Sequence, residues 1–426
     1  MDRDDPMFNE PFATPSICSE ETGRLLFNSN GCWIADSTAQ MMENGDSISP
    51  SELMYLFNYY PDRLPIVEGI IALEFGNEED YTIFNFVPEI AIIEGVKSIQ
   101  NQKLCMPRIL LNTIHPNGIV SVLAQELFKG NICILGLSAW RHANGRDWWV
   151  LFQLNDVRSS FVRFLIGPDY VLGPYIQEIQ VPIWKYCDGT SIFTPDGSKW
   201  LHSEWQSGTQ LFDFDRMSGE LSNFRYIKHE FEQIAGDIVI SPNSQYMYLL
   251  NGPYLRQFDI TKPSIEAIMS TEDTVGVHDS KFMLFDVKGT NFGGGKLAPN
   301  GKIYINSTSS RCAWSVISKP DKRGKDCNVE NNAVILPTYN GGLILPNQPN
   351  YRLGPIDGSA ADTLGIDNMP VAKFRKDADA LVYCKYVFTD LLFYEPVVWN
   401  WDFGDGGISS DTSPVHTYQA DGTYQV

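Results

Sequence analysis

Short turns flanked by apolar segments recur along the first part of the chain. The three clearest copies follow Phe193, Ile240 and Leu297 and read Thr-Pro-Asp-Gly, Ser-Pro-Asn-Ser and Ala-Pro-Asn-Gly. A weaker copy, His-Pro-Asn-Gly, begins at His115. Each turn precedes an apolar strand, a polar loop and a further strand, and the prolines of the three clear turns lie 47 and 57 residues apart. The pattern predicts a repeated unit built from several strands.

A period of roughly 40–50 residues with several strands in each unit is typical of a β-propeller. A single four-stranded blade cannot bury both of its faces, whereas blades packed around an axis bury each other. Residues 16–336 leave room for six or seven blades, and we favour seven. The first domain is therefore predicted to be a β-propeller over residues 1–336.

The composition agrees with an all-β protein. Of the 426 residues, 43% are hydrophobic and 12% aromatic, while 34 Gly and 25 Pro provide many turns. The net charge of −20 repels nucleic acid and anionic membrane surfaces, so neither is expected as a partner. No apolar run approaches the ~18 residues that span a bilayer, so no membrane insertion is expected. The N-terminal residues show no signal peptide, which taken alone predicts a cytoplasmic protein.

The C-terminal residues carry a second pattern. Apolar and polar side chains alternate from Val397 to Phe403, as in a strand with one buried face. Three short motifs resemble the PKD domain. They are W-D-F-G-D-G beginning at Trp401, P-x-H-x-Y beginning at Pro414 and G-T-Y-x-V beginning at Gly422. This resemblance implies an immunoglobulin-like β-sandwich over residues 369–426 whose last strand is incomplete, and a role as an extracellular spacer or binding module. Residues 337–368, rich in Gly, Pro, Asn and Asp, are predicted to be a linker.

The carboxylates of Asp402 and Asp405 have two interpretations. Both stand beside glycines, where aspartate stabilises tight turns by hydrogen bonds to its own backbone. Calcium binding is the alternative, but the D-x-D-x-D-G ligand series is absent. We therefore expect turn chemistry and no cofactor, with calcium as a weaker possibility.

The chain as a whole is similar to secreted Bacteroidetes proteins that combine a β-propeller with PKD domains and are exported by type IX secretion. The segments that carry this similarity are residues 23–27, 34–36, 42–46, 142–149, 345–347 and 350–354. The resemblance implies an extracellular or cell-surface protein. It carries over no catalytic residue.

Eight cysteines are widely spaced and form no C-x-x-C motif, so a zinc site is not indicated. Cys18 and Cys32 bracket one expected hairpin, and Cys312 and Cys327 bracket another. Either pair could form a disulfide bond, or the thiols could be scattered through the core.

The segment from Arg141 to Trp149 contains a histidine, two arginines, a carboxylate and two tryptophans within nine residues. A binding site for a glycan or protein ligand would use Arg141, His142, Asn144, Arg146, Asp147 and Trp148, with guanidinium groups gripping an acidic or sugar ligand and an indole stacking on a sugar ring. The alternative is a hairpin in which Asp147 and Arg146 hold the turn while a tryptophan fills a gap between blades. The alternative has more support from the sequence.

No catalytic arrangement is visible. Six histidines allow a Ser–His pair in principle, but there is no G-x-S-x-G motif, and no His, Cys, Asp or Glu cluster has the spacing of metal ligands. We therefore predict a recognition or adhesion protein that is not an enzyme, with the PKD domain as a spacer. The alternatives are a secreted hydrolase of glycans or peptides with its site in the propeller funnel, and a purely structural module.

Overall fold

The structure is a computed structural model of the 426-residue chain. The residues that it describes are 15–19, 22–29, 31–46, 48, 69–75, 80–93, 96–133, 136–156, 158–181, 189–204, 208–228, 235–278, 291–307, 311–340, 345, 347–366, 368, 374–379, 381–390 and 398–426.

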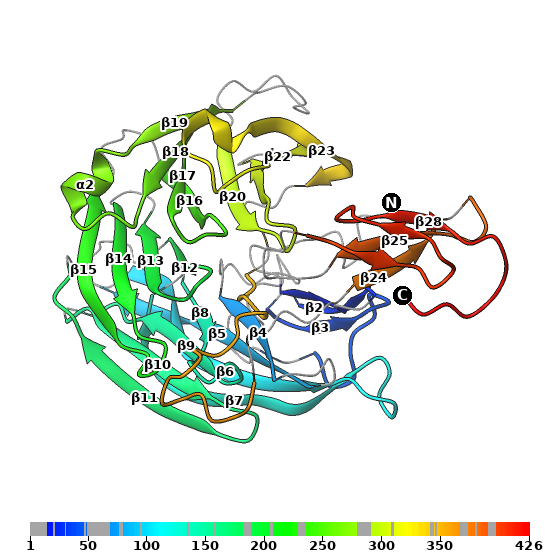
Figure 1. Ribbon diagram of the computed structural model, residues 1–426. Coiled ribbons are helices and arrows are strands. Elements are labelled where there is room, and N and C mark those ends of the chain that lie inside the picture. Colours follow the sequence, from blue (N-terminus) through cyan, green and yellow to red (C-terminus); the bar gives the residue numbers. More distant parts are fainter. Residues whose placement is uncertain are drawn as a thin grey trace. The chain divides into compact units, whose positions relative to one another are not determined.

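Nearly all of the regular structure consists of β-strands (Figure 1). In chain order the elements are β1 (Ser16–Cys18), β2 (Leu25–Ser29), β3 (Ile34–Asp36), β4 (Ile70–Glu74), β5 (Asp80–Ile93), β6 (Val96–Leu110), β7 (Ile119–Ile132), β8 (Ser138–Arg141), β9 (Trp148–Gln153), β10 (Ser160–Ile166), β11 (Val171–Glu178), β12 (Thr190–Phe193), β13 (Lys199–Glu204), β14 (Gly208–Phe214), β15 (Leu221–Lys228), β16 (Ala235–Ile240), β17 (Tyr246–Asn251), β18 (Tyr254–Asp259), α2 (Ile265–Met269), β19 (Asp273–Val277), β20 (Phe292–Leu297), β21 (Ile303–Ser307), β22 (Arg311–Ile317), η2 (Gly324–Cys327), β23 (Val329–Asn340), β24 (Phe374–Ala378), β25 (Lys385–Asp390), β26 (Trp401–Asp402), β27 (Ile408–Ser409) and β28 (Val415–Thr417).

The first 23 strands form six sheets. Sheet 1 is β1–β3, and sheets 2 to 6 are the four-stranded meanders β4–β7, β8–β11, β12–β15, β16–β19 and β20–β23. The first strands of neighbouring sheets lie side by side, since β12 contacts both β8 and β16, and β16 contacts β20. The sheets follow one another around a common centre, as the colours from cyan to yellow show (Figure 1). This arrangement is a β-propeller, so the predicted fold class is confirmed.

Six sheets are present in the described residues, the lower of the two expected numbers. The seventh blade that we favoured is not found there. The strands β5, β6 and β7 explain the difference, because they are 14, 15 and 14 residues long and use chain length that the repeat spacing had assigned to a further blade.

The three clear turns join the first and second strands of their sheets, whereas the weaker copy at His115 lies between β6 and β7, the third and fourth strands of sheet 2. The Thr194 N–H donates to the Lys199 carbonyl oxygen across the turn from β12 to β13, at 3.0 Å. The equivalent bond from Ser241 to Tyr246 closes the turn from β16 to β17, at 2.8 Å. In the first turn the Asp196 carboxylate also accepts from the Thr194 hydroxyl. Aspartate and asparagine recur here because their side chains satisfy turn backbone and hydroxyl groups.

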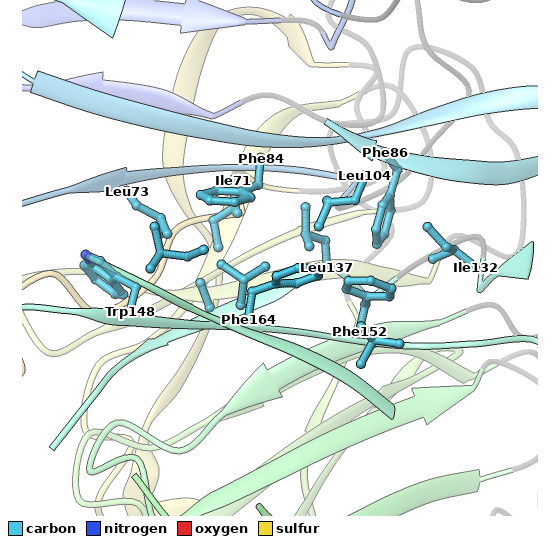
Figure 2. Packing of buried hydrophobic residues seen from close by; sticks show 14 of the residues in the cluster. Ile71, Leu73, Phe84, Phe86, Leu104, Ile132, Leu137, Trp148, Phe152 and Phe164 are labelled. Carbon is cyan, nitrogen blue, oxygen red and sulfur yellow. The ribbon is translucent and has the colours of Figure 1, made fainter. Parts of the chain in front are cut away.

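The propeller core lies between sheets. Figure 2 shows side chains from sheets 2 and 3, among them Phe84, Phe86, Trp148 and Phe152, meeting in one apolar layer. Phe86 and Phe152 pack edge to face with ring centroids 5.6 Å apart. Similar apolar layers lie between sheets 3 and 4, sheets 4 and 5, and sheets 5 and 6. Burial between neighbouring blades therefore stabilises sheets that could not cover both faces alone.

Strands β24 to β28 belong to a second compact unit, made of residues 367–426 with residues 18–25. Phe388, Phe403 and Tyr418 form its core. The expected alternation is present, because Val398 is exposed and Phe403 is buried, although strand β26 is only two residues long. The Asp402 carboxylate accepts from the Gly404 N–H and that of Asp405 from the Gly407 N–H, both at 2.9 Å. These bonds are the turn chemistry expected for the two aspartates.

Part of the segment predicted to be a linker packs on the propeller. Strand β23 continues to Asn340, and beyond it Asn347 Nδ2 donates to the Leu137 carbonyl oxygen at 2.9 Å. The Tyr351 hydroxyl donates to the Ala72 carbonyl oxygen at 2.8 Å, and the Ile356 N–H to that of Ala143 at 2.8 Å. These contacts tie residues 347–356 to sheets 2 and 3. The domain boundaries at residues 336 and 369 stay a prediction.

Neither of the two candidate disulfide bonds is present, because Cys18, Cys32 and Cys327 are not disulfide-bonded. Cys32 and Cys327 are buried in the apolar layers, a position that their sequence spacing does not reveal. Cys133, in contrast, is disulfide-bonded. None of the helices in the described residues is long and apolar enough to span a membrane.

Candidate active site

Three polar side chains form a row across sheet 4, on the face that meets sheet 3. Ser191 on β12 pairs with His202 on β13, and His202 pairs with Gln210 on β14. Directly paired residues of antiparallel strands point to the same face of a sheet. Trp200 lies two residues before His202 and therefore on that face, and its Nε1 donates to the Ser138 hydroxyl of sheet 3 at 3.0 Å. We call Ser191, His202 and Gln210 the polar row.

The Ser191 hydroxyl and His202 Nδ1 are in hydrogen-bond contact, 2.8 Å apart. His202 is only 2% exposed, and its ring lies parallel to that of Trp200 with an interplanar angle of 9°. Burial lowers the pKa of His202 from 6.5 to about 4, because the charged imidazolium is poorly solvated there. The imidazole is therefore neutral at pH 7 and able to accept a proton from the hydroxyl.

Several buried polar atoms at this site have no hydrogen-bond partner among the described residues. They are His202 Nε2 and both amide atoms of Gln210, which is 0% exposed. Gln153 Oε1 is a further case. Gln153 lies on the same face of β9 as Leu151, which packs with Trp200 between sheets 3 and 4. An unsatisfied buried polar group costs about 1–3 kcal/mol, so their concentration here calls for a functional explanation.

A buried carboxylate lies close to the polar row. Glu204 is 1% exposed and follows His202 by two residues on β13, so both side chains share a face. Tyr226 on β15 pairs with Gln210. Burial, followed by the negative charge of Glu204, raises the pKa of Tyr226 to about 12. The site thus combines a hydroxyl, a neutral imidazole, amides and one carboxylate.

Gly136, two residues before β8, brings its backbone against the Ser–His pair. Its φ is +102°, a conformation that favours glycine. A Cβ at this position would lie 2.4 Å from Ser191 Oγ and 3.5 Å from His202 Nδ1. Glycine is therefore required here both for the backbone conformation and for the close approach.

The residues predicted to bind a ligand lie elsewhere, at the turn from β8 to β9. The Arg141 guanidinium is 4% exposed, stacks 3.9 Å from the Trp148 ring and forms an ion pair with Glu74 at 2.8 Å. Its Nη2 also donates to the Tyr351 carbonyl oxygen at 3.3 Å. Burial lowers the pKa of Arg141 to about 10, and the Glu74 charge opposes this shift. Trp148 Nε1 donates to the Glu74 carbonyl oxygen at 2.7 Å.

The other predicted residues also contact one another or the nearby chain. Asp147 accepts from Arg146 Nε at 2.8 Å, from Asn144 Nδ2 at 2.5 Å and from the Tyr170 hydroxyl. Burial would raise the pKa of Asp147, but these hydrogen bonds outweigh it and lower the pKa. His142 Nδ1 accepts from the Asn144 N–H at 3.1 Å, and its Nε2 lies 3.2 Å from the Met217 carbonyl oxygen. The structure brings all six residues together in one turn, and ligand binding by them stays a prediction.

The polar row is not among the residues predicted from the sequence, although the sequence carries one signal for it. The turn after Phe193 is evident in the sequence, and counting outward from it pairs Phe193 with Trp200 and Ser191 with His202. The pairing of His202 with Gln210, between β13 and β14, places the Gln210 side chain on the same face. Among the described residues no group of three or more His, Cys, Asp or Glu side chains is placed to hold a metal ion. Calcium binding by Asp402 and Asp405 stays an untested alternative.

Comparison with known families identifies the second unit. Residues 369–426 match the PKD domain family. The molecule is therefore a β-propeller followed by a PKD domain, as the sequence motifs predicted. No curated protein matches this sequence.

Solved structures show a loose similarity. A protein from Lactobacillus plantarum is 10% identical, with 94% of each chain covered and a TM-score of 0.39. The periplasmic gluconolactonase of Pseudomonas aeruginosa is 9% identical over 78% of this chain and 96% of its own, with a TM-score of 0.38. A “putative 6-phosphogluconolactonase” from Bacteroides uniformis ATCC 8492 is 16% identical over 63% of this chain and 82% of its own, with a TM-score of 0.34.

These descriptions correct one expectation. The prediction that the chain is not an enzyme is not retained, because proteins that it resembles bear the names of hydrolases. With TM-scores this low, the similarity transfers no activity to this chain. The chemistry must be argued from its own residues.

Proposed function

We propose that the propeller is a hydrolase of the acyl-transfer type, with Ser191 as nucleophile and His202 as general base. The observation that carries the proposal is the 2.8 Å contact between the Ser191 hydroxyl and His202 Nδ1, at a buried site where His202 Nε2 and the Gln210 amide lack partners in the described residues. A nucleophile within hydrogen-bond reach of a base is the basic requirement of covalent hydrolysis.

The reaction follows from this contact. Ser191 Oγ attacks the carbonyl carbon of an ester, lactone or amide while its proton passes to His202 Nδ1. The bond from that carbon to the leaving oxygen or nitrogen then breaks, and the leaving group takes the proton from His202. A water molecule then gives a proton to His202 and attacks the acyl carbon. The bond from that carbon to Ser191 Oγ breaks, His202 returns the proton to Ser191 Oγ, and the carboxylic acid is released. The Gln210 amide is available to hydrogen-bond the substrate.

The pKa of His202 gives this base an unusual working range. A base must be unprotonated to accept the Ser191 proton, and His202 stays neutral down to about pH 4. We therefore expect turnover to fall on the acid side near pH 4 rather than near 6.5. A loss of turnover nearer pH 6.5 would mean that His202 is hydrated in the working enzyme.

The PKD domain would hold the propeller away from its attachment, outside the cell. Two observations support this placement. PKD domains occur in extracellular proteins, as the resemblance implies, and Cys133 is disulfide-bonded, which is typical of oxidising compartments. Substrates on the cell surface or in the medium, glycan esters and peptides included, would then be within reach.

The test is turnover by the purified chain on p-nitrophenyl acetate, a lactone panel and a peptide panel. Ser191→Ala and His202→Gln are each expected to lower kcat/KM at least ~10³-fold, the usual cost of removing a nucleophile or its base. Ser203→Ala is the matched control, because Ser203 is buried on β13, directly after His202, and points to the opposite face. Wild-type turnover in the Ser191 variant would overturn the proposal. Glycan or protein binding with no turnover would instead favour a recognition role.

A further inference from the structure

Trp200 is the aromatic neighbour of the Ser–His pair. It is 0% exposed and lies two residues before His202 on β13, so both side chains share one face of sheet 4. The two rings lie parallel, with centroids 6.0 Å apart and an interplanar angle of 9°. An offset parallel arrangement at such a distance is favoured between aromatic rings. The plane of the His202 ring is therefore set in part by that of Trp200.

The orientation of Trp200 is held on its other sides. Phe161, from β10 of sheet 3, meets the indole edge to face with ring centroids 5.6 Å apart. Phe212, the partner of Trp200 on β14, has its ring centroid 5.8 Å away. The indole Nε1 donates to the Ser138 hydroxyl at 3.0 Å. Two rings and one directional hydrogen bond together favour a single orientation of the indole.

The hydroxyl that holds Trp200 belongs to a short segment that is itself anchored. The Ser138 hydroxyl donates to the Leu151 carbonyl oxygen at 3.2 Å. One residue earlier, the Leu137 carbonyl oxygen accepts from Asn347 Nδ2 at 2.9 Å. Ser138 is buried, so water competes little for its hydrogen bonds. The segment thus gives Trp200 a fixed anchor.

The same segment also touches the other member of the pair. Gly136 lies so close that a Cβ there would be 2.4 Å from Ser191 Oγ, and it thereby limits the position of the hydroxyl. Ser138, two residues later, holds the indole that lies beside His202. A nucleophile and its base benefit from a common support, because small misplacements of reacting groups are costly.

We infer that Trp200 is the positioning residue of the Ser191–His202 pair and that the Ser138 hydroxyl is its anchor. Trp200 acts through His202, because its indole holds the imidazole in the plane in which Nδ1 faces the Ser191 hydroxyl, 2.8 Å away. This inference rests on the proposed function, since positioning affects turnover only if the pair is catalytic. It assigns no chemical step to Trp200.

The experiment compares two tryptophans of the same apolar layer. Trp200→Phe keeps a flat ring beside His202 but removes the hydrogen bond to Ser138. It is expected to lower kcat on p-nitrophenyl acetate at least ~10-fold with KM within about 2-fold, because an interaction that only aligns the reacting groups acts on kcat. Trp149→Phe is the matched control, since Trp149 is also buried in this layer and loses the bond from its Nε1 to the Arg216 carbonyl oxygen, at 2.9 Å. Its kcat is expected to stay within about 2-fold of the wild type.

Ser138→Ala tests the anchor from the other side. It leaves the indole in place but removes its acceptor, so it should lower kcat by about the same factor as Trp200→Phe. The double variant should lose no more than either single variant, because both remove one interaction. Additive losses would overturn the anchor. Wild-type kcat in Trp200→Phe, measured per folded molecule, would overturn the positioning role and keep the hydrolase.

The pKa of His202, followed by NMR of labelled histidine in the wild type and the three single variants, separates this inference from the proposed function. In the wild type it is expected at about 4. A loosened ring admits water, so Trp200→Phe and Ser138→Ala should raise the pKa toward 6.5, while Trp149→Phe should leave it unchanged. This pattern without turnover by the wild type would overturn the hydrolase and keep the positioning role. The same pKa in all four proteins, without turnover, would overturn both.

Discussion

The turn from β8 to β9 and the polar row of sheet 4 both contain a histidine and other buried polar groups, but they differ in how those groups are satisfied. At the turn, Asp147 accepts three hydrogen bonds and the Arg141 Nη atoms bond Glu74 and Tyr351, so that only Arg141 Nε among these groups lacks a partner in the described residues. At the row, Gln210 has no partner for either amide atom among the described residues. Buried groups that satisfy one another stabilise a fold, whereas buried groups without partners cost stability and suggest another use.

The largest effect is expected from breaking the turn. Arg141→Met removes a buried cation and breaks its ion pair with Glu74, which should lower the free energy of unfolding by about 3–5 kcal/mol. Turnover per folded molecule should not change. Arg158→Met is the matched control, because the Arg158–Glu178 pair is exposed to solvent and should contribute little to stability. Chemical denaturation measures both. Equal losses would mean that the Arg141 network is not a structural support.

The second effect concerns pH and belongs to the row. The pKa of His202 is lowered to about 4 in the folded state, so between pH 6.5 and 4 the unfolded chain binds a proton that the folded chain does not. Stability should therefore fall as the pH falls through this window, by roughly 3 kcal/mol at about 1.4 kcal/mol per pH unit. His202→Gln should flatten this part of the stability curve. An unchanged slope in that variant would assign the acid sensitivity to other groups.

The third effect tests the close approach of sheets 3 and 4. Gly136→Ala adds a methyl group 2.4 Å from Ser191 Oγ, whereas Gly301→Ala, also at positive φ, has nothing within 4 Å. The first variant should lose about 1–3 kcal/mol more stability than the second, the usual cost of overpacking. It should also lose turnover, because the displaced hydroxyl no longer faces His202. Denaturation and kinetics on both variants decide this, and equal behaviour would show that the sheets separate easily.

The sequence predicted the propeller because its turns carry strong local signals. Pro195, Pro242 and Pro299 mark turns whose strands must pair on either side, and the PKD strings around Phe403 did the same for the second unit. The number of blades was harder to predict from the sequence, because no turn motif marks the unusual lengths of β5, β6 and β7. The polar row could not be predicted because neither Ser191 nor Gln210 belongs to a recognisable motif. Their position on one face of the sheet follows only from the register of three strands.

The smallest expected change in stability is that of Gln210→Leu, and whether this variant is stabilised or destabilised tests the comparison most directly. Gln210 and Gln257 are both buried glutamines on sheet strands, but Gln257 donates to the Tyr248 hydroxyl and the Lys322 carbonyl oxygen at 2.8 Å each and accepts from the Gly324 N–H at 2.7 Å. Replacing an unsatisfied amide by an apolar side chain of similar size removes a desolvation cost, so Gln210→Leu should be neutral or stabilise by up to about 1 kcal/mol. Gln257→Leu strands three partners and should destabilise.

The two glutamine variants therefore decide whether the row is held for function. A stabilised Gln210→Leu protein that has lost turnover would show that the fold tolerates a cost at this position because catalysis uses the amide. Destabilisation equal to that of Gln257→Leu would show that Gln210 is satisfied in solution, and the contrast between the row and the turn would disappear.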